Sequence, residues 1–424
     1  MDERIYREYV AILKEELQPA MGCTEPIAVA YCAALARKTL DALPETVEVL
    51  ASANIIKNVK SVIVPNTNGQ RGIAAAAAAG IISGNADAQL QVLASLTPEQ
   101  VDAVGAYLRQ AAFTVRRTDK DYVFDIQLRV TAGADSASVE IAGYHTNVIH
   151  IEKNGIVQFH KDYQESGSQH ATDRSLLTVE QIIAFANEVD IADVRETLQR
   201  QIDYNWAIAE EGLRGDYGAN IGRILLQSYG MSIHNRAKAY AAAGSDARMN
   251  GCDLPVVINS GSGNQGLTAS LPVIVYAKEL GVTQQMLYRA LVVSNLVTIH
   301  LKTGIGSLSA YCGATAAGCG AAAGVTYLYG GQYREIAHTI VNAIAIDSGM
   351  ICDGAKASCA AKIASAVEAG LLGMQMQMHE SQFYGGDGIV VKGVENTIRN
   401  IGTLASEGMR ETDRTIIRMM IQEH

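Results

Sequence analysis

Cysteines are the most reactive side chains in this sequence, and three of the seven lie in two short glycine-containing segments. Cys352 and Cys359 flank a stretch with one lysine, and Cys312 precedes Cys352 by 40 residues. Soft thiolates in such numbers hold iron–sulfur clusters or zinc. The spacing matches neither the C-x2-C pairs of zinc ribbons nor the cysteine runs of ferredoxins, so spacing alone favours buried structural thiols. Cys319, seven residues after Cys312, would share its helical face and is the alternative ligand.

Cys23 stands just before an expected helix, with Thr24 as its N-cap and Pro26 in its first turn. The free amides and the dipole of a helix N-terminus stabilise a thiolate and lower its pKa. Cys23 is therefore a candidate nucleophile or general base. A structural cysteine at a helix start fits the same pattern, and Cys32, among Ala and Tyr, is expected to belong to the core.

A polar loop at residues 259–266 follows an apolar run and carries three glycines in G-x-G-x-x-G spacing. A dinucleotide site would need a second strand ending in an acidic residue about 20 residues further on. A helical pattern stands there instead. The loop therefore favours binding of a small carboxylate through its amides and hydroxyls. The candidate residues are Ser260, Gly261, Ser262, Gly263 and Asn264.

The elements that must position these residues are mostly helical. Residues 2–18 form an amphipathic pattern, and no proline follows Pro272, which indicates helices separated by glycine turns. The middle of the chain predicts strands at 113–118, 122–131, 138–150 and 156–159, with a hairpin turn at Asn154-Gly155. Thr97 and Gln100 have capping-box spacing.

We therefore expect a mainly α catalytic domain made of residues 1–85 and 176–424, interrupted by a smaller inserted α+β domain at 86–175. The polar segment 161–175 would be a surface loop or linker. The short strand candidates at 47–52 and 62–64 fit either part.

Composition excludes several classes of protein. The 424 residues are 48% hydrophobic and 18% charged, which rules out a disordered chain. The net charge of −10, without any basic run, argues against nucleic acid as a partner. The uncharged stretches 303–333 and 254–277 are rich in small and polar residues, which favours buried helices over membrane spans. An odd number of cysteines and a charged N-terminus without a secretory signal predict reduced thiols in a cytoplasmic protein.

The combination of five motifs, in this order, resembles the iron–sulfur L-cysteine desulfidase family, which is related to the α part of iron–sulfur L-serine dehydratases. The motifs are GCTEP at 22–26, NSGSGN at 259–264, LSAYCG from Leu308 to 313, CDGAKASC at 352–359 and GGDG at 385–388. The resemblance spans nearly the whole chain. It implies β-elimination from L-cysteine to pyruvate, ammonia and sulfide, without pyridoxal phosphate.

The same resemblance implies Cys312, Cys352 and Cys359 as ligands of a [4Fe-4S] cluster and Cys23 as the catalytic cysteine. Three thiolates leave one iron open, where it can act as a Lewis acid and is exposed to oxygen. Thr24, Glu25, the loop 260–264 and Lys302 are our candidates for binding the amino-acid substrate. We also expect a homo-oligomer. L-serine dehydration, and a non-catalytic amino-acid-binding protein with structural cysteines, are the alternatives.

Overall fold

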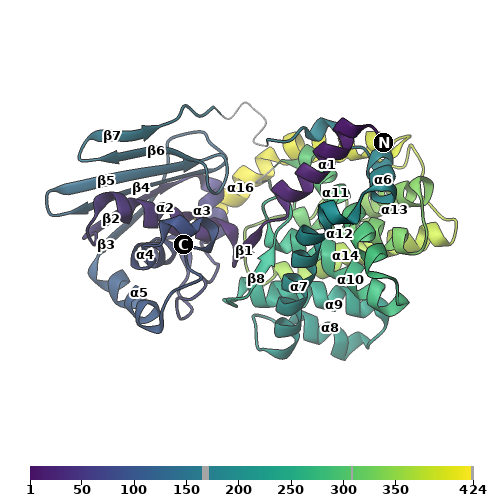
Figure 1. The fold of residues 1–424 in the computed structure, drawn as a ribbon, viewed down its shortest axis with the longest axis horizontal. Helices are drawn as coiled ribbons and strands as arrows, with labels where there is room; N and C mark the ends of the chain where they lie inside the picture. Colours follow the sequence, from purple (N-terminus) through teal and green to yellow (C-terminus); the bar gives the residue numbers. More distant parts are fainter. Residues whose placement is uncertain (165–170, 307–308, 422–424) are drawn as a thin grey trace.

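The chain folds into two lobes that lie side by side, one built around a β-sheet and the other made of helices (Figure 1). The structure is a computed structural model that describes residues 1–164, 171–306 and 309–421. Leu308 of the LSAYCG motif and part of the predicted linker 161–175 lie outside these residues. The mainly helical fold with a sheet region agrees with the fold class expected from the sequence.

The sheet lobe contains a six-stranded sheet in the order β3-β2-β4-β5-β6-β7, in which only the β2–β3 pair is parallel. Its strands are β2 (Thr46–Ala51), β3 (Ala112–Arg117), β4 (Asp125–Ala132), β5 (Asp135–Ala142), β6 (Val148–Lys153) and β7 (Ile156–His160). Its helices are α2 (Thr24–Leu40), α3 (Ala53–Val59), α4 (Gly72–Ser83) and α5 (Pro98–Gln110), with a 3-10 turn η1 (Ala86–Gln91). Helices α2 and α4 contact the sheet.

The period-2 hydrophobic pattern predicted most strands of this sheet correctly. Ile126, Leu128 and Val130 of β4 are fully buried, as alternation predicts. Asn154 and Gly155 both have positive φ and form the β6–β7 hairpin turn. The capping box at α5 is also present. The single strand predicted at 138–150 is wrong, because a turn that begins at Gly143 (φ +83°) divides it into β5 and β6.

The sheet lobe begins earlier in the chain than residue 86, where the sequence placed the start of the inserted domain. The candidate at 47–52 lies inside the sheet as β2, between β3 and β4, whereas Ile63 makes only an isolated bridge to Arg71. The core of this lobe includes side chains of α2 and α4. The pairing partners of β2 lie more than 60 residues downstream, so local patterning could not assign it.

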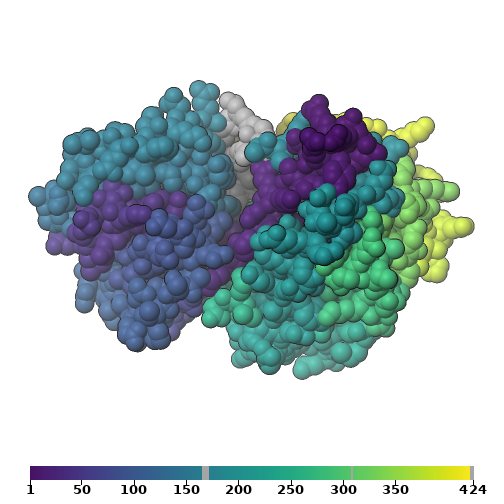
Figure 2. Space-filling model, in the orientation of Figure 1, coloured from purple at the N-terminus to yellow at the C-terminus, as the bar shows by residue number. Residues whose placement is uncertain are grey.

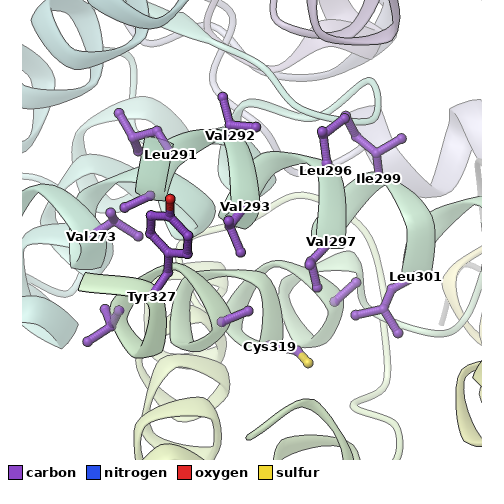
Figure 3. Packing of buried hydrophobic residues seen from close by; sticks show 14 of the residues in the cluster. Val273, Leu291, Val292, Val293, Leu296, Val297, Ile299, Leu301, Cys319 and Tyr327 are labelled. Atoms are coloured by element: carbon purple, nitrogen blue, oxygen red, sulfur yellow. The ribbon is translucent and has the colours of Figure 1, made fainter. Parts of the chain in front are cut away.

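The helical lobe packs around α10, α11 and α12, whose apolar side chains interlock in Figure 3. A Cβ on Gly320 of α12 would lie 2.1 Å from the Thr298 hydroxyl of α11, so only glycine permits this close approach. The helices are α1 (Glu3–Glu16), α6 (Val179–Glu188), α7 (Ile191–Arg214), α8 (Ile221–Tyr229), α9 (Ile233–Met249), α10 (Gly263–Leu280), α11 (Gln284–Ile305), α12 (Gly313–Leu328), α13 (Tyr333–Ile346), α14 (Cys359–Met378) and α15 (Val394–Thr403), with the short turns η2 (Arg174–Leu176) and η3 (Leu404–Gly408).

The lobes meet along a surface groove in Figure 2, and β1 (Pro19–Met21) and α16 (Arg410–Ile421) are two of the described elements that link them. Strand β1 pairs antiparallel with β8 (Pro255–Val257), so β8 does not begin the parallel unit that a dinucleotide fold requires. Helix α16 reaches α3, where the buried ammonium of Lys57 lies 2.5 Å from the Asp413 carboxylate. In the described ranges, no helix combines the length and the apolar character needed to cross a bilayer.

Candidate functional site

Cys23 lies where the lobes meet, at the N-terminus of α2, and its thiol donates a hydrogen bond to Glu25 Oε2 at 3.0 Å. Cys23, and not Thr24 as predicted, is the N-cap of α2. The Thr24 hydroxyl does not cap the helix; it donates to Gly261 O at 3.0 Å and to Glu25 Oε2 at 3.1 Å. Thr24 therefore links the start of α2 to the polar loop of the helical lobe.

The carboxylate of Glu25 is buried but well supported. Besides Cys23 and Thr24, Asn58 of α3 donates to its Oε1 at 3.1 Å. Burial opposes ionisation, yet the nearby charge of His145, the Cys23 hydrogen bond and Arg248 together hold the pKa of Glu25 below its usual value. Glu25 is thus a carboxylate at neutral pH, in direct contact with a thiol.

The thiol of Cys23 is protonated in this setting. Burial raises its pKa well above the ordinary value, and the Glu25 carboxylate raises it further, while Arg248 offsets only part of the effect. The sequence-based expectation of a lowered pKa is therefore wrong. A helix N-terminus does favour a thiolate, but here a neighbouring carboxylate and the loss of water outweigh it.

The polar loop 260–264 lies next to this pair, as its contact with Thr24 shows. Ser260 (φ +50°) and Gly261 (φ +74°) form the turn that leads into α10. Ser262 caps α10 without a side-chain hydrogen bond. Asn264 accepts a hydrogen bond from Arg248 of α9 at 3.0 Å, and Gly263 packs directly against the Arg248 guanidinium.

Cys312 and Cys352 are brought together by a short antiparallel bridge between Tyr311 and Ile351. The amide of Cys312 donates to Met350 O at 2.8 Å, and the amide of Cys352 donates to Ala310 O at 2.6 Å. The two thiols are hydrogen-bonded to each other.

Cys359, the first residue of α14, lies within electrostatic range of both other thiols. Its thiol contacts Gly354 O at 3.7 Å. The structure thus places the three predicted cluster ligands in one group.

Positive charge surrounds these thiols. The hydrogen bond from Cys312 lowers the pKa of Cys352 despite burial, and Lys57 and Lys362 lower it further. The Lys362 ammonium bonds to Ile351 O and to the Asp353 carboxylate. The Cys352 hydrogen bond and burial raise the pKa of Cys312, and burial raises that of Cys359, so Cys352 is the one thiol of the three that this setting favours as a thiolate.

Lys302 is buried near the cysteines. Burial lowers its pKa to about 8, while Cys352, Cys312 and Glu16 act in the opposite direction. Its ammonium donates to Gly306 O. Its electrostatic interactions with Cys352 and Cys312 associate Lys302 with the thiol group, whereas we expected it to bind a carboxylate together with the loop 260–264.

The two centres are neighbours. A Cβ on Gly354, between Cys352 and Cys359, would lie 2.3 Å from the carbonyl oxygen of Lys57 and 3.6 Å from Asn58 Cα. Asn58 is a hydrogen-bond donor to Glu25. Only two residues of α3 therefore separate the cysteine loop from the Cys23–Glu25 pair.

The remaining cysteines lie in hydrophobic cores. Cys319, the alternative to Cys312, is 2% exposed, and its thiol contacts Ile340 O of α13 at 3.8 Å (Figure 3). Cys32 contacts carbonyls of the sheet, and Cys252 is buried in the helical core. Burial alone raises the pKa of Cys319, and no charge offsets it.

The three grouped thiols are the donor type that iron–sulfur clusters take. Across the described residues, no three His, Cys, Asp or Glu side chains converge on a point where one metal ion would bind. A cluster carries its own iron and sulfide between the thiolates, so it requires thiols gathered around a space. The all-cysteine donor set and its surrounding lysines meet the chemical preference of iron–sulfur clusters.

Sequence reasoning missed Arg248, His145 and Asn58. His145 approaches the loop from the sheet lobe, with its Cε1 3.6 Å from a Cβ placed on Gly261. One signal was available for Arg248, because it is a charge near the end of an alanine-rich helix. No local pattern marks His145 or Asn58.

The family model described as serine dehydratase alpha chain matches residues 87–418. The chain therefore belongs to the serine dehydratase alpha chain family. Among curated relatives, a UPF0597 protein of Desulfitobacterium hafniense is 57% identical over 421 residues, covering 99% of this chain and 98% of the relative. UPF0597 proteins of Lachnoclostridium phytofermentans and Treponema denticola are 48% and 45% identical, covering 98% and 100% of this chain and 100% of each relative. These relatives' names state no substrate.

Proposed function

We propose that this protein is an iron–sulfur lyase that converts L-cysteine and water to pyruvate, ammonia and hydrogen sulfide. The observation that carries the proposal is the grouping of Cys312, Cys352 and Cys359 beside the hydrogen-bonded Cys23–Glu25 pair. Membership of the serine dehydratase alpha chain family supports the same class of elimination.

Cys312, Cys352 and Cys359 would hold a [4Fe-4S] cluster. Such a cluster, with one iron free of protein ligands, supplies a Lewis acid for the substrate carboxylate or the leaving sulfur. Lys57, Lys302 and Lys362 stabilise the negative charge of the thiolates. Because Lys57 and Lys302 are almost fully buried, their charges act through little water and are weakly screened.

Cys23 and Glu25 would move the proton that elimination removes from the α-carbon. Glu25 would accept the thiol proton against the resting order of the two pKa values, so the Cys23 thiolate would form only transiently and take the α-proton while Glu25 holds the thiol proton. The thiol hydrogen bond at 3.0 Å already marks the path of the first transfer. Burial keeps competing water away from both groups.

L-serine is the second candidate substrate, favoured by membership of the serine dehydratase alpha chain family. Both amino acids carry the same carboxylate, amine and α-proton and differ only in the leaving group. One polar contact to that group decides between such substrates.

Anaerobic reconstitution with iron and sulfide, followed by turnover, tests the proposal. We expect sulfide and pyruvate in equal amounts from L-cysteine. Pyruvate from L-serine, with no sulfide from L-cysteine, would assign the second substrate. A reconstituted protein that binds amino acids without releasing pyruvate from either would overturn the assignment as an enzyme.

A further inference from the structure

Arg248 presents a buried guanidinium that lacks a carboxylate partner. The side chain belongs to α9, is 2% exposed and makes one hydrogen bond, from NH1 to Asn264 Oδ1 at 3.0 Å. Its Nε is buried without an acceptor. Among the residues that the structure describes, no Asp or Glu lies within ion-pair distance of it.

Arg248 interacts electrostatically with the Glu25 carboxylate, but the oxygens of Glu25 accept hydrogen bonds from other residues. They accept from Cys23, Thr24 and Asn58. A buried cation without a direct counter-charge is costly, and buried charges in proteins are normally paired. The missing partner of Arg248 is therefore an anion that the chain does not provide.

The N-terminus of α10 points to the same place. This helix is 18 residues long, and Ser262 caps it without a side-chain hydrogen bond, so the positive end of the helix dipole is uncompensated there. A Cβ on Gly263 would lie 2.2 Å from Arg248 Nε. Only glycine leaves room for the guanidinium against the helix end.

A second unpartnered group approaches from the sheet lobe. His145 Nε2 is buried without a hydrogen bond, and its ring lies against Gly261 of the loop that leads into α10. Two buried nitrogen atoms without hydrogen-bond partners, Arg248 Nε and His145 Nε2, therefore flank the same loop beside Cys23, one from each lobe.

We propose that Arg248, together with the N-terminal turn of α10, binds the α-carboxylate of the amino-acid substrate. A guanidinium matches a carboxylate with two parallel hydrogen bonds. Arg248 acts electrostatically on both Cys23 and Glu25. A carboxylate bound to Arg248 would therefore lie near the proton-transfer pair. This inference rests on the proposed function for the identity of the ligand as an amino acid.

Calorimetric binding of L-alanine and L-alaninamide to the full-length protein tests the inference. L-alanine has the amine and carboxylate but no leaving group, whereas the amide lacks the negative charge. We expect wild type to prefer L-alanine, and Arg248→Gln to bind it about 10- to 100-fold more weakly with amide binding unchanged. Arg248→Lys should recover part of the affinity. Arg236→Gln, which changes an ion-paired arginine of the same helix, should have no effect.

Gly263→Ala is a second variant that keeps every charge; its Cβ would clash most closely with the guanidinium and also with Val256, so it should also weaken L-alanine binding. Thermal unfolding of each variant shows whether it is folded. Wild type that does not distinguish L-alanine from its amide, or does not bind it, would overturn the inference. So would a folded Arg248→Gln protein with unchanged affinity. If reconstituted protein releases no sulfide or pyruvate yet L-alanine binding depends on Arg248, the proposed function fails and the carboxylate site stands.

Discussion

Replacing Glu25 by Gln separates two roles for Cys23. The amide keeps the shape of the side chain but removes the charge that accepts hydrogen bonds from Cys23, Thr24 and Asn58. Because the Glu25 carboxylate raises the pKa of Cys23, the variant should have a more acidic thiol. If the thiolate acts alone, Glu25→Gln should therefore be as active as wild type or more active.

If Glu25 receives the thiol proton, the same variant loses its proton acceptor. General acid–base catalysis contributes about 10²- to 10⁴-fold in rate, so we expect kcat to fall by that factor although the thiol has become more acidic. The substrate carboxylate would remain bound elsewhere, so KM should change much less than kcat.

The assay is anaerobic pyruvate release by reconstituted protein over a range of pH, with the cluster absorbance measured in each sample. Glu48→Gln, the same change at an ion-paired residue of β2, is the matched control and should be fully active. An active Glu25→Gln enzyme, within threefold of wild type and with an intact cluster, would refute the relay.

Four further outcomes are expected. Serine replacement of a proposed cluster ligand (Cys312, Cys352 or Cys359) should abolish iron binding, as measured by iron and sulfide analysis. The same replacement of a core cysteine (Cys32, Cys252 or Cys319) should not. Activity should decay in air and return after anaerobic reconstitution, and full activity in iron-free aerobic protein would contradict the mechanism. Cys23→Ser should keep the cluster spectrum and lose about 10²- to 10⁴-fold in rate. The pKa of Asp125 is raised to about 7, first by burial and then by Glu140. The folded protein therefore holds this proton up to a higher pH than the unfolded chain does. The free energy of unfolding should consequently fall as pH rises from about 4 to 7. Asp125→Asn should flatten this dependence in chemical denaturation, with a limit of roughly 4 kcal/mol.

Sequence patterns identified the cysteines that the fold groups together, but not the electrostatics around Cys23. The cysteine motifs identified three thiols that lie together in the fold. Each of these cysteines stands at a turn or helix start in a glycine-containing segment, which is a pattern that can be recognised in the sequence. The pKa of Cys23 was predicted in the wrong direction, because it depends on burial and on which way the Glu25 side chain turns. Neither is encoded in the local helix-start pattern.

Residues that reach the site from distant parts of the sequence could not be predicted either, because their positions depend on tertiary packing. Arg248 and His145 reach the polar loop from α9 and from the β5–β6 turn, and only tertiary packing brings them together. In the same way, β2 joined the sheet through partners that follow it by more than 60 residues. Its own six residues read as a strand, and nothing in them identifies a sheet.

The pairing of β1 with β8 also orders events during biosynthesis. Pro19 of β1 must find Val257 of β8, and ribosomes add roughly 5–20 residues each second. The nascent N-terminus therefore waits on the order of tens of seconds for its partner strand, with Cys23 already outside the ribosome. Cys359 emerges later still, and α16, which reaches α3, is among the last elements made. A cluster that needs Cys312, Cys352 and Cys359 would consequently not be complete until Cys359 has emerged, long after Cys23.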